Sequence, residues 1–455
     1  MNSIEKGRSF SSRFNTRAWI IHFSIFLCLY MGEVAIAQQD TTGKESIDEP
    51  YSKKEVEVGE ASRPIQDSVD DTVPTEAEER ELGANENPMA ASVIQRDIKR
   101  EDEAKIEPGR TTGFDVYGSI RARYREQGGE TEWQDASSRL GLEADWQFLP
   151  EYYLLGRYEV GFNVLARLDH DKNNDEFMDT INTRLLYAGL ELPNGQLIVG
   201  KNWSPYYEVA AFTDRFEGAG GRGSGTYNAL TDGGPTGTGR ADNAVQGNIS
   251  LNFLPHTVFK PFDLNLQLQQ GNSIPFGNGA DYGNAVTASA VMATRSNVSV
   301  GLAYNYASID LDKNPSLRSN GITGSAQAAL VGMRAFGERW YAGLTGASLK
   351  NHETTNEGTY FNGWGSEAYG QYRITDRLWS IGGYNILKPD SDQAQAGDFR
   401  ISYAVFGLRY SLEDFRRMIW ANVRINSGYA ADGTPRGNVY TIGVRWDMSR
   451  RGWHM

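Results

Sequence analysis

The sequence predicts an all-β protein, a transmembrane antiparallel β-barrel of 16 strands preceded by a disordered spacer, and three observations support this prediction. From Gly113 onward, polar and apolar residues alternate along stretches of about ten residues. The connections between these stretches are alternately short and long. Glycine (50 residues) and aromatic residues (11%) are abundant in the 455 residues, which suits short strands and tight turns.

The composition excludes several other classes. The mean hydropathy is only -0.52, but alternate residues of a barrel strand face lipid, so a low mean is compatible with a membrane. A helical membrane protein is excluded because no second apolar run approaches about 20 residues. The net charge is -13 and no basic patch is present, so we expect no nucleic-acid partner. Cys28 is the only cysteine, and it falls in the targeting segment.

Residues 1–37 are predicted to be a signal peptide. The apolar stretch 18–30 is too short to span a bilayer, and Ala35, Ile36 and Ala37 form a cleavage site of small residues. Basic residues precede the apolar stretch, at Lys6, Arg8, Arg13 and Arg17. The chain is therefore expected to be exported.

Residues 38–110 are predicted to be an acidic, mostly disordered spacer. They contain 20 acidic and 10 basic residues and a single aromatic residue, Tyr51. Such a segment buries too little apolar surface to offset the entropy lost on ordering. Residues 89–106 could form a short amphipathic helix, although a charged coil is the favoured interpretation.

The barrel is predicted to occupy 111–448. Its predicted strands are 113–125, 136–147, 153–167, 181–191, 195–201, 240–253, 262–270, 284–294, 297–307, 322–334, 337–349, 361–373, 377–387, 399–411, 416–427 and 438–448. Short turns on one side and long loops on the other are typical of outer-membrane barrels. An even number of strands places both chain ends on the short-turn, periplasmic side.

A soluble β-sandwich is the main alternative fold. Its inner face would have to be apolar, whereas Arg121, Arg123 and Arg125 alternate along one face of the first predicted strand. A water-filled lumen accepts such a face and a dry core does not. The pattern therefore favours the barrel.

The longest connection, 202–239, is predicted to fold into the lumen. It far exceeds the usual length of a structureless loop. Its glycines allow tight folding without side-chain bulk, at Gly218, Gly220, Gly221, Gly223 and Gly225. A floppy external loop is the alternative.

Several segments carry a resemblance to a known family. They are FDVYGSIRARY (114–124), SSRLGLEADWQF (137–148), INTRLLYAGLEL (181–192), LIVGKNWSPYYEVAAFTDRFEGAGG (197–221) and GTGRADNAVQ (237–246). The sequence resembles the general diffusion porins of Gram-negative bacteria across essentially all of 111–448. The resemblance implies a homotrimer in outer-membrane lipid and lipopolysaccharide. It also implies a third loop that narrows a pore for small hydrophilic solutes and ions.

The resemblance assigns Asp214 and Glu217 to the acidic positions of the constriction loop, with Glu217 one residue nearer Asp214 than in the family pattern. It assigns the basic wall opposite to Arg121, Arg123, Arg139, Arg184 and Arg240. The family's basic position after the first Tyr-Gly is Ser119 here, and Arg121 and Arg123 point the same way by strand alternation. Opposed charges across a narrow gap would orient dipolar solutes and separate ions.

Three alternative functions make different demands on the sequence. The arginines would suit a substrate-specific channel for anions or sugars, but 31 basic against 36 acidic residues in 111–455 opposes strong anion selectivity. An enzyme needs a nucleophile near a histidine base, and the mature chain offers only His170, His256, His352 and His454. We expect no catalysis, cofactor or metal. The spacer 38–110 could contact peptidoglycan or a periplasmic protein and anchor the envelope.

The end of the chain departs from the family pattern. Family members usually end on an aromatic residue, whereas Met448 closes the last predicted strand and residues 449–455 are expected to extend beyond it. Either Trp446 replaces the terminal aromatic residue or the signal for membrane insertion is weak.

Overall fold

The computed structural model describes residues 112–165, 181–254, 257–277, 279–413 and 416–454. The predicted signal peptide (1–37) and spacer (38–110) lie outside these ranges. Among the described residues, no helix has the length and apolarity needed to cross a lipid bilayer.

The first half of the described chain contains β1 (Gly113–Gln127), β2 (Glu130–Asp135), β3 (Arg139–Leu149), β4 (Tyr152–Phe162), β5 (Ile181–Leu192), β6 (Gly195–Trp203), α5 (Pro205–Ala210), η1 (Asn228–Leu230), β7 (Arg240–Leu251), β8 (Phe262–Gln269) and β9 (Ala285–Ala293). The second half contains β10 (Val298–Ala307), η2 (Pro315–Arg318), β11 (Ala326–Phe336), β12 (Trp340–Thr354), β13 (Tyr360–Arg373), β14 (Leu378–Pro389), η3 (Ala394–Ala396), β15 (Ile401–Glu413), β16 (Arg417–Asn426) and β17 (Val439–His454).

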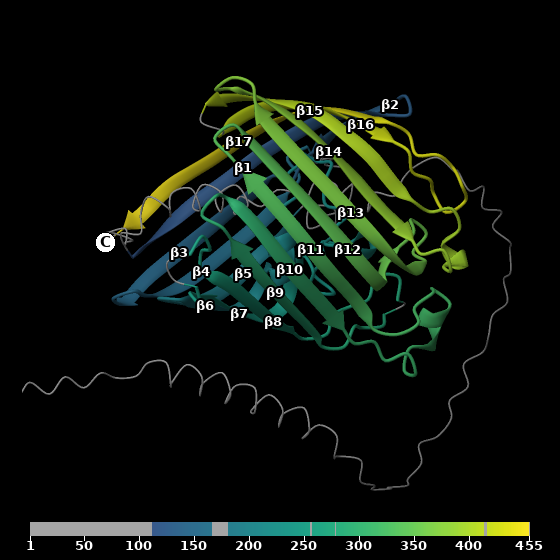
Figure 1. Cartoon of the computed structure of the whole chain (residues 1–455), viewed down its shortest axis with the longest axis horizontal. Coiled ribbons are helices and arrows are strands. Elements are labelled where there is room, and N and C mark those ends of the chain that lie inside the picture. The colour runs from purple at the N-terminus through teal and green to yellow at the C-terminus, as the bar shows by residue number, and fades with distance from the viewer. Residues whose placement is uncertain (1–111, 166–180, 255–256, 278, 414–415, 455) are drawn as a thin grey trace, which may run out of the picture. The chain divides into compact units, whose positions relative to one another are not determined.

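These strands form one closed antiparallel sheet (Figure 1). Each strand pairs with its neighbour in sequence, and β1 closes the ring by pairing with β17. Both β2 and β3 pair with β1, at successive positions along it, so they are two halves of one strand interrupted at 136–138. Counted this way, the barrel has 16 strands, and the fold predicted from the alternating pattern is confirmed.

Two predicted boundaries differ most from the structure. Residues 126–135 were expected to be a long connection, but they form a tight hairpin between β1 and β2. Gly128 and Gly129 have φ of 61° and 91°, and positive φ at both positions suits a two-residue hairpin turn. The final strand also continues past Met448: β17 runs on to His454, which pairs with Gly113. Most of the predicted extension 449–455 therefore belongs to the barrel.

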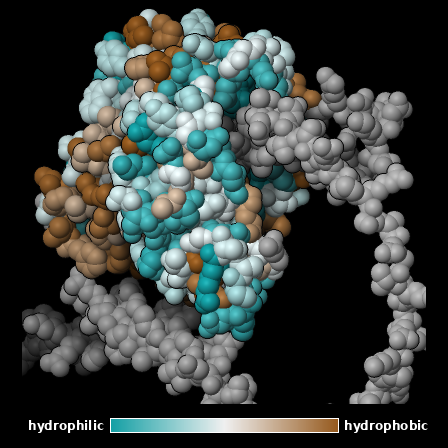
Figure 2. All heavy atoms as spheres, turned by 90° about the vertical axis from the view of Figure 1, so that its right-hand side faces the viewer, coloured by the Kyte–Doolittle hydropathy of each residue, from teal (hydrophilic) through white to brown (hydrophobic). Residues whose placement is uncertain are grey.

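The two faces of the strands differ as a membrane barrel requires. Large apolar side chains are exposed on the outer wall, among them Ile120, Leu142, Leu186, Leu302, Val331, Leu344, Phe406, Ile442 and Val444. Arginine, glutamate and asparagine side chains alternate with them and are buried inside. Figure 2 looks onto the end of the molecule that carries the long loops: hydrophilic residues cover this face, and hydrophobic residues gather at its margin.

Three of the long loops pack together at that end. Ile274 and Tyr282 of the β8–β9 loop, Leu317 and Ile322 of the β10–β11 loop and Ala229 of the β6–β7 loop share one buried apolar cluster with Tyr360, the first residue of β13. A pocket of about 710 Å³ lies beside this cluster, between the β8–β9 and β10–β11 loops.

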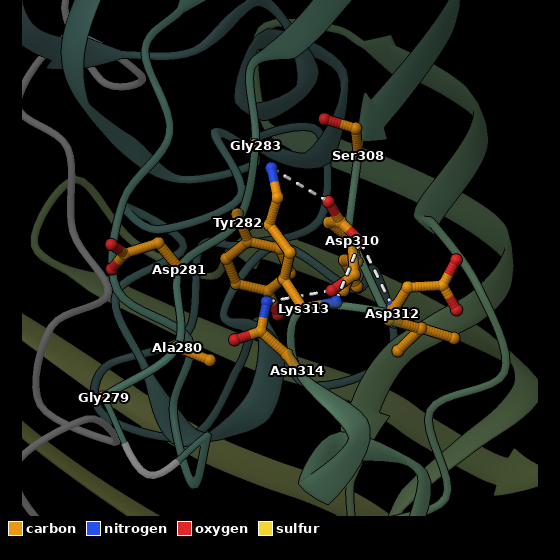
Figure 3. A pocket seen from close by; sticks show the side chains of 12 residues that line it. Gly279, Ala280, Asp281, Tyr282, Gly283, Ser308, Asp310, Asp312, Lys313 and Asn314 are labelled. Atoms are coloured by element: carbon orange, nitrogen blue, oxygen red, sulfur yellow. Dashed lines mark hydrogen bonds and ion pairs between the residues drawn. The ribbon is translucent and has the colours of Figure 1, made fainter. Parts of the chain in front are cut away.

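Figure 3 shows the carboxylate of Asp310 at this pocket, accepting hydrogen bonds from the backbone N–H groups of Asp312 and Lys313. These bonds belong to the local loop structure. The pocket therefore lies among the loops and does not include the predicted pore residues.

Candidate functional site

The connection between β6 and β7, residues 204–239, is called the third loop below. Its first turn is the short helix α5, which begins at Pro205 because the Ser204 side chain accepts a hydrogen bond from the backbone N–H of Tyr207 at 3.1 Å. Tyr206, Val209 and most of the residues that follow are buried. The prediction that this loop folds inward is confirmed.

Glycines on the inner wall make room for the loop. A Cβ on Gly301 would lie 2.9 Å from the side chain of Val209, and one on Gly343 would lie 2.2 Å from the backbone oxygen of Phe212. Gly332, which pairs with Gly301 across β10 and β11, is equally close to Val209. The part of the sheet around these glycines is therefore flat enough for the loop to pack directly on it.

Polar contacts fix the loop at other points of the wall. The backbone N–H of Gly221 donates to Glu367 on β13 at 2.8 Å, and the Tyr403 hydroxyl on β15 donates to the oxygen of Ala219 at 2.7 Å. On the other side of the loop, Gln269 on β8 donates to the oxygen of Gly234 at 2.7 Å. The loop is therefore anchored along the arc from β8 to β16.

Asp214, the first predicted acidic residue, lies inside the loop. Its Oδ2 accepts hydrogen bonds from the hydroxyls of Tyr207 (3.0 Å) and Tyr227 (2.8 Å), and the residue is 1% exposed. Burial, followed by the nearby Asp214 carboxylate, raises the pKa of both tyrosines well above the usual value, so both remain protonated donors. Asp214 thus organises the loop and places a negative charge within it.

Glu217, the second predicted acidic residue, is held against the inner face of the barrel at β15 and β16. Its Oε1 lies 2.6 Å from Nη2 of Arg409 on β15, and its backbone oxygen accepts a hydrogen bond from Asn422 on β16 at 2.9 Å. The residue is 5% exposed. Its charge is therefore balanced by an arginine that the sequence did not single out.

The five predicted basic residues all lie on the inner face of the barrel and are buried. We call them the arginine wall: Arg121 on β1, Arg123 on β1, Arg139 on β3, Arg184 on β5 and Arg240 at the start of β7. Their strands lie outside the arc from β8 to β16 on which the third loop is anchored, and two of them, through Arg123 and Arg240, contact the loop at its edges. Wall and loop therefore occupy complementary arcs of the lumen.

Arg139 differs from its neighbours in the wall. It is 2% exposed, and both terminal nitrogens of its guanidinium are buried without a hydrogen-bond partner among the described residues. Arg121, Arg184 and Arg445 act on it electrostatically, together with the carboxylate of Glu159. Arg139 therefore lies among several like charges of the wall.

Carboxylates balance other members of the wall. Nε of Arg184 lies 2.8 Å from Glu159 on β4, which also accepts a hydrogen bond from the Tyr117 hydroxyl at 2.8 Å. Asp447 on β17 accepts a hydrogen bond from Ser119 at 2.5 Å and lies 4.0 Å from Arg121. The hydroxyl of Ser119 is thus part of this hydrogen-bonded network.

Arg240 pairs with the third loop itself. Its Nε lies 3.1 Å from Oδ2 of Asp232, and Nζ of Lys201 lies 3.5 Å from the same oxygen. Burial opposes ionisation of Asp232, but Arg240, Lys201 and the backbone N–H of Gly234 outweigh it and lower the pKa of Asp232. The end of the loop is thereby held against β7.

Wall and loop come together at Arg123. A Cβ on Gly218 would lie 2.7 Å from Nη1 of Arg123, and Gly218 has a φ of 69°, which favours glycine. Nε of Arg123 donates to Gln134 on β2 at 2.8 Å. Gly218 and Arg123 therefore lie close together where the two arcs meet.

Several charged residues of this site were not assigned to it from the sequence, among them Arg157, Glu159, Arg409 and Arg445. All lie on inward-facing positions of strands that were predicted. Arg157 and Glu159 alternate on β4, and Arg445 lies 2.8 Å from Asp447. The alternating pattern could have found them, but it does not say which strands face each other.

Comparisons with known proteins agree with this architecture, although no family model matches the chain. Outer membrane porin PhoE of Citrobacter freundii is 26% identical over 304 residues, which are 65% of this chain and 80% of that protein. Outer membrane porin F of Xenorhabdus nematophila is 30% identical over 104 residues, covering 22% of this chain and 26% of that protein.

Solved structures show the same fold. OmpF of Salmonella typhi, in complex with daunomycin, has a TM-score of 0.59 at 18% identity and covers 74% of this chain and 98% of its own. An anion-selective porin from Comamonas acidovorans has a TM-score of 0.53 at 13% identity and covers 74% of this chain and all (100%) of its own. OmpT of Vibrio cholerae, in its trimer form, has a TM-score of 0.51 at 14% identity, with coverage of 74% and 100%.

The predicted resemblance is thus confirmed in sequence and in fold. The chain is a homologue of the general diffusion porins of the Gram-negative outer membrane.

Proposed function

We propose that this porin is a passive channel for small hydrophilic solutes and ions, narrowed between the arginine wall and the third loop. The single observation that carries the proposal is the division of the lumen into two arcs. The third loop is anchored on β8 to β16, and the arginines project from β1, β3, β5 and β7. A solute that passes between them must approach guanidinium groups on one side.

The proposed site residues act in two ways. Asp214 and Glu217 hold the loop in place and contribute negative charge to its arc, while the arginine wall faces them. The guanidinium of Arg139 is buried, so it supports anion preference through its positive charge beside the lumen and not through direct contact with solutes. This observation favours anion preference as the second candidate function.

Reversal potentials across a planar bilayer in a KCl gradient test the proposal. The native channel is expected to pass both ions, and Arg139→Gln should shift the reversal potential toward cation permeability. Arg318→Gln removes the same charge from an exposed loop residue, 58% exposed at its side chain, and should leave the potential unchanged. An identical reversal potential in the native and Arg139→Gln channels would place Arg139 outside the conduction path.

We also propose that the protein works as a trimer and has no catalytic role. The neighbour in trimer form supports the first point. For the second, Nε2 of the buried His352 lies 2.8 Å from the backbone oxygen of Gly225, which fits a role in anchoring the loop. Chemical cross-linking of the detergent-folded protein should give a trimer, and a lipase assay on the same sample should give no product.

We also propose roles for the predicted signal peptide and the spacer. Cleavage after Ala37 would leave the spacer 38–110 in the periplasm, where it could contact peptidoglycan. Mass spectrometry of the mature N-terminus tests the cleavage site. Co-sedimentation with purified peptidoglycan, with and without 38–110, tests the contact, and equal sedimentation of the two forms would contradict it.

A further inference from the structure

Four arginines lie near one another at the loop end of the barrel, beyond the arginine wall along β1, and one of them packs on the ring of a tyrosine. Tyr403 on β15 is the tyrosine. We call the arginines the mouth cluster: Arg125 on β1, Arg222 in the third loop, Arg424 on β16 and Arg436 in the loop 427–438.

Strand register brings two of these residues close together. β17 lies between β1 and β16: Arg125 pairs with Thr441 of β17, and Arg424 pairs with Val439, two residues further along the same strand. Two strand spacings separate their backbones by roughly 10 Å. Both are inward positions, since Arg125 continues the face of Arg123 and Arg424 that of Asn422, which contacts the third loop. Their long side chains can therefore converge.

Arg424 is the centre of the cluster. Its Cζ lies 5.0 Å from the centre of the Tyr403 ring, and its Nε is buried without a hydrogen-bond partner among the described residues. The groups that act on it most strongly, besides Tyr403, are Arg125, Arg222 and Arg436. Like charges held this close repel each other, so a bound anion would relieve the repulsion.

The remaining members are held in position by the surrounding loops. Nη2 of Arg436 donates to Asn356 of the β12–β13 loop at 2.9 Å, and its guanidinium lies 5.4 Å from the ring of Phe399. Arg222 lies between two residues anchored on the wall, Gly221 and Gly223. A site held this way loses little side-chain entropy when it binds a ligand.

Carboxylates also lie near the cluster. Glu367 and Asp214 act electrostatically on Tyr403, but Glu367 accepts the backbone N–H of Gly221 and Asp214 accepts the hydroxyl of Tyr207. Glu353 acts electrostatically on Arg222. Its Oε2, however, accepts the backbone N–H of Ala229 at 3.1 Å and so serves the third loop. The cluster therefore keeps an excess of positive charge at a mouth whose outer face is hydrophilic (Figure 2).

We propose that the mouth cluster is a binding site for multivalent oxyanions, solutes that carry two or more carboxylate or phosphate groups. The proposal rests on the proposed channel function and deepens it. A guanidinium group matches the geometry of either oxyanion with two parallel hydrogen bonds. A multivalent anion can neutralise several arginines at once, whereas chloride cannot. The site would concentrate such solutes at the entrance before they reach the arginine wall.

Current block in planar bilayers tests the proposal. Single channels conduct in KCl while citrate or pyrophosphate is added to one side, and the concentration that halves the current is measured. The loop side should require a lower concentration than the short-turn side. Arg424→Gln should raise the half-blocking concentration by roughly tenfold, as expected for loss of one charge-assisted hydrogen bond. Arg424→Lys, which keeps the charge, should raise it less.

Matched variants separate this site from the constriction. Arg318→Gln, an exposed arginine in a loop at the same end, should keep the native half-blocking concentration. Arg139→Gln should change the reversal potential and keep the half-blocking concentration within about twofold. Block by citrate alone or by pyrophosphate alone supports the site and identifies the preferred oxyanion. A conducting channel blocked by neither, or blocked equally well after Arg424→Gln, would overturn the mouth site and leave the channel proposal intact.

Discussion

Glu217 of the third loop and Arg409 of β15 meet at 2.6 Å, and both side chains are largely buried. This ion pair joins the third loop to the barrel strand β15, at a point far from both ends of the loop. A buried pair of this kind is costly to break on one side only, because the remaining charge is left without its partner.

Removing the acidic charges of the loop should shift selectivity. Asp214→Asn combined with Glu217→Gln is expected to increase permeability to anions, because the loop loses two negative charges and Arg409 loses its carboxylate partner. Reversal potentials in a KCl gradient measure the shift. If the potential does not move, the charge of the loop does not influence the conduction path.

A side chain at Gly343 should displace the loop. Gly343→Ala would place a Cβ 2.2 Å from the backbone oxygen of Phe212, whereas Gly346→Ala on the same strand meets its nearest neighbour at 3.9 Å. We expect Gly343→Ala to destabilise loop packing by about 1–3 kcal/mol and to raise single-channel conductance. The matched Gly346→Ala channel should conduct like the native one, and equal conductance in both variants would contradict the packing argument.

The hydroxyl of Tyr227 should contribute to the stability of the third loop. Tyr227→Phe removes one donor to the buried Asp214 and should destabilise the loop by about 1–3 kcal/mol. Limited proteolysis should then cleave the third loop faster. Tyr158→Phe, whose side chain is 47% exposed on the outer wall, is the control and should match the native rate.

Acidification should loosen the third loop only below about pH 3.8, the usual pKa of an aspartate. The pKa of Asp232 is lowered from its usual 3.8, so its pairing with Arg240 and Lys201 stabilises the folded loop fully above that value. This contribution is lost as the pH falls through the lowered pKa. Single-channel recordings should therefore show a steady loop from pH 7 to pH 5 and new fluctuations only below about 3.8.

The same reasoning predicts the effect of Asp232→Asn. This variant should fluctuate at pH 7 as the native channel does in acid, because the neutral amide cannot pair with the two cations. A variant as steady as the native channel at pH 7 would show that the other anchors of the loop suffice.

The barrel, its strands and the faces of those strands follow from local patterns in the amino-acid sequence. A two-residue period specifies which side chains point inward, and turn residues mark where strands end, so both are local properties. Resemblance to a family further located the third loop and the five arginines of the wall. The hairpin at Gly128 and Gly129 and the extension of β17 to His454 were missed, because alternation alone does not limit strand length.

Which charges meet depends on the tertiary structure. Closure of the sheet brings β1 next to β17, one strand away from β16, and this places Arg125 near Arg424. Likewise, Glu217 finds Arg409 only because the loop crosses the lumen to β15. Contacts between residues distant in sequence depend on the whole ring of strands, and no local pattern encodes them.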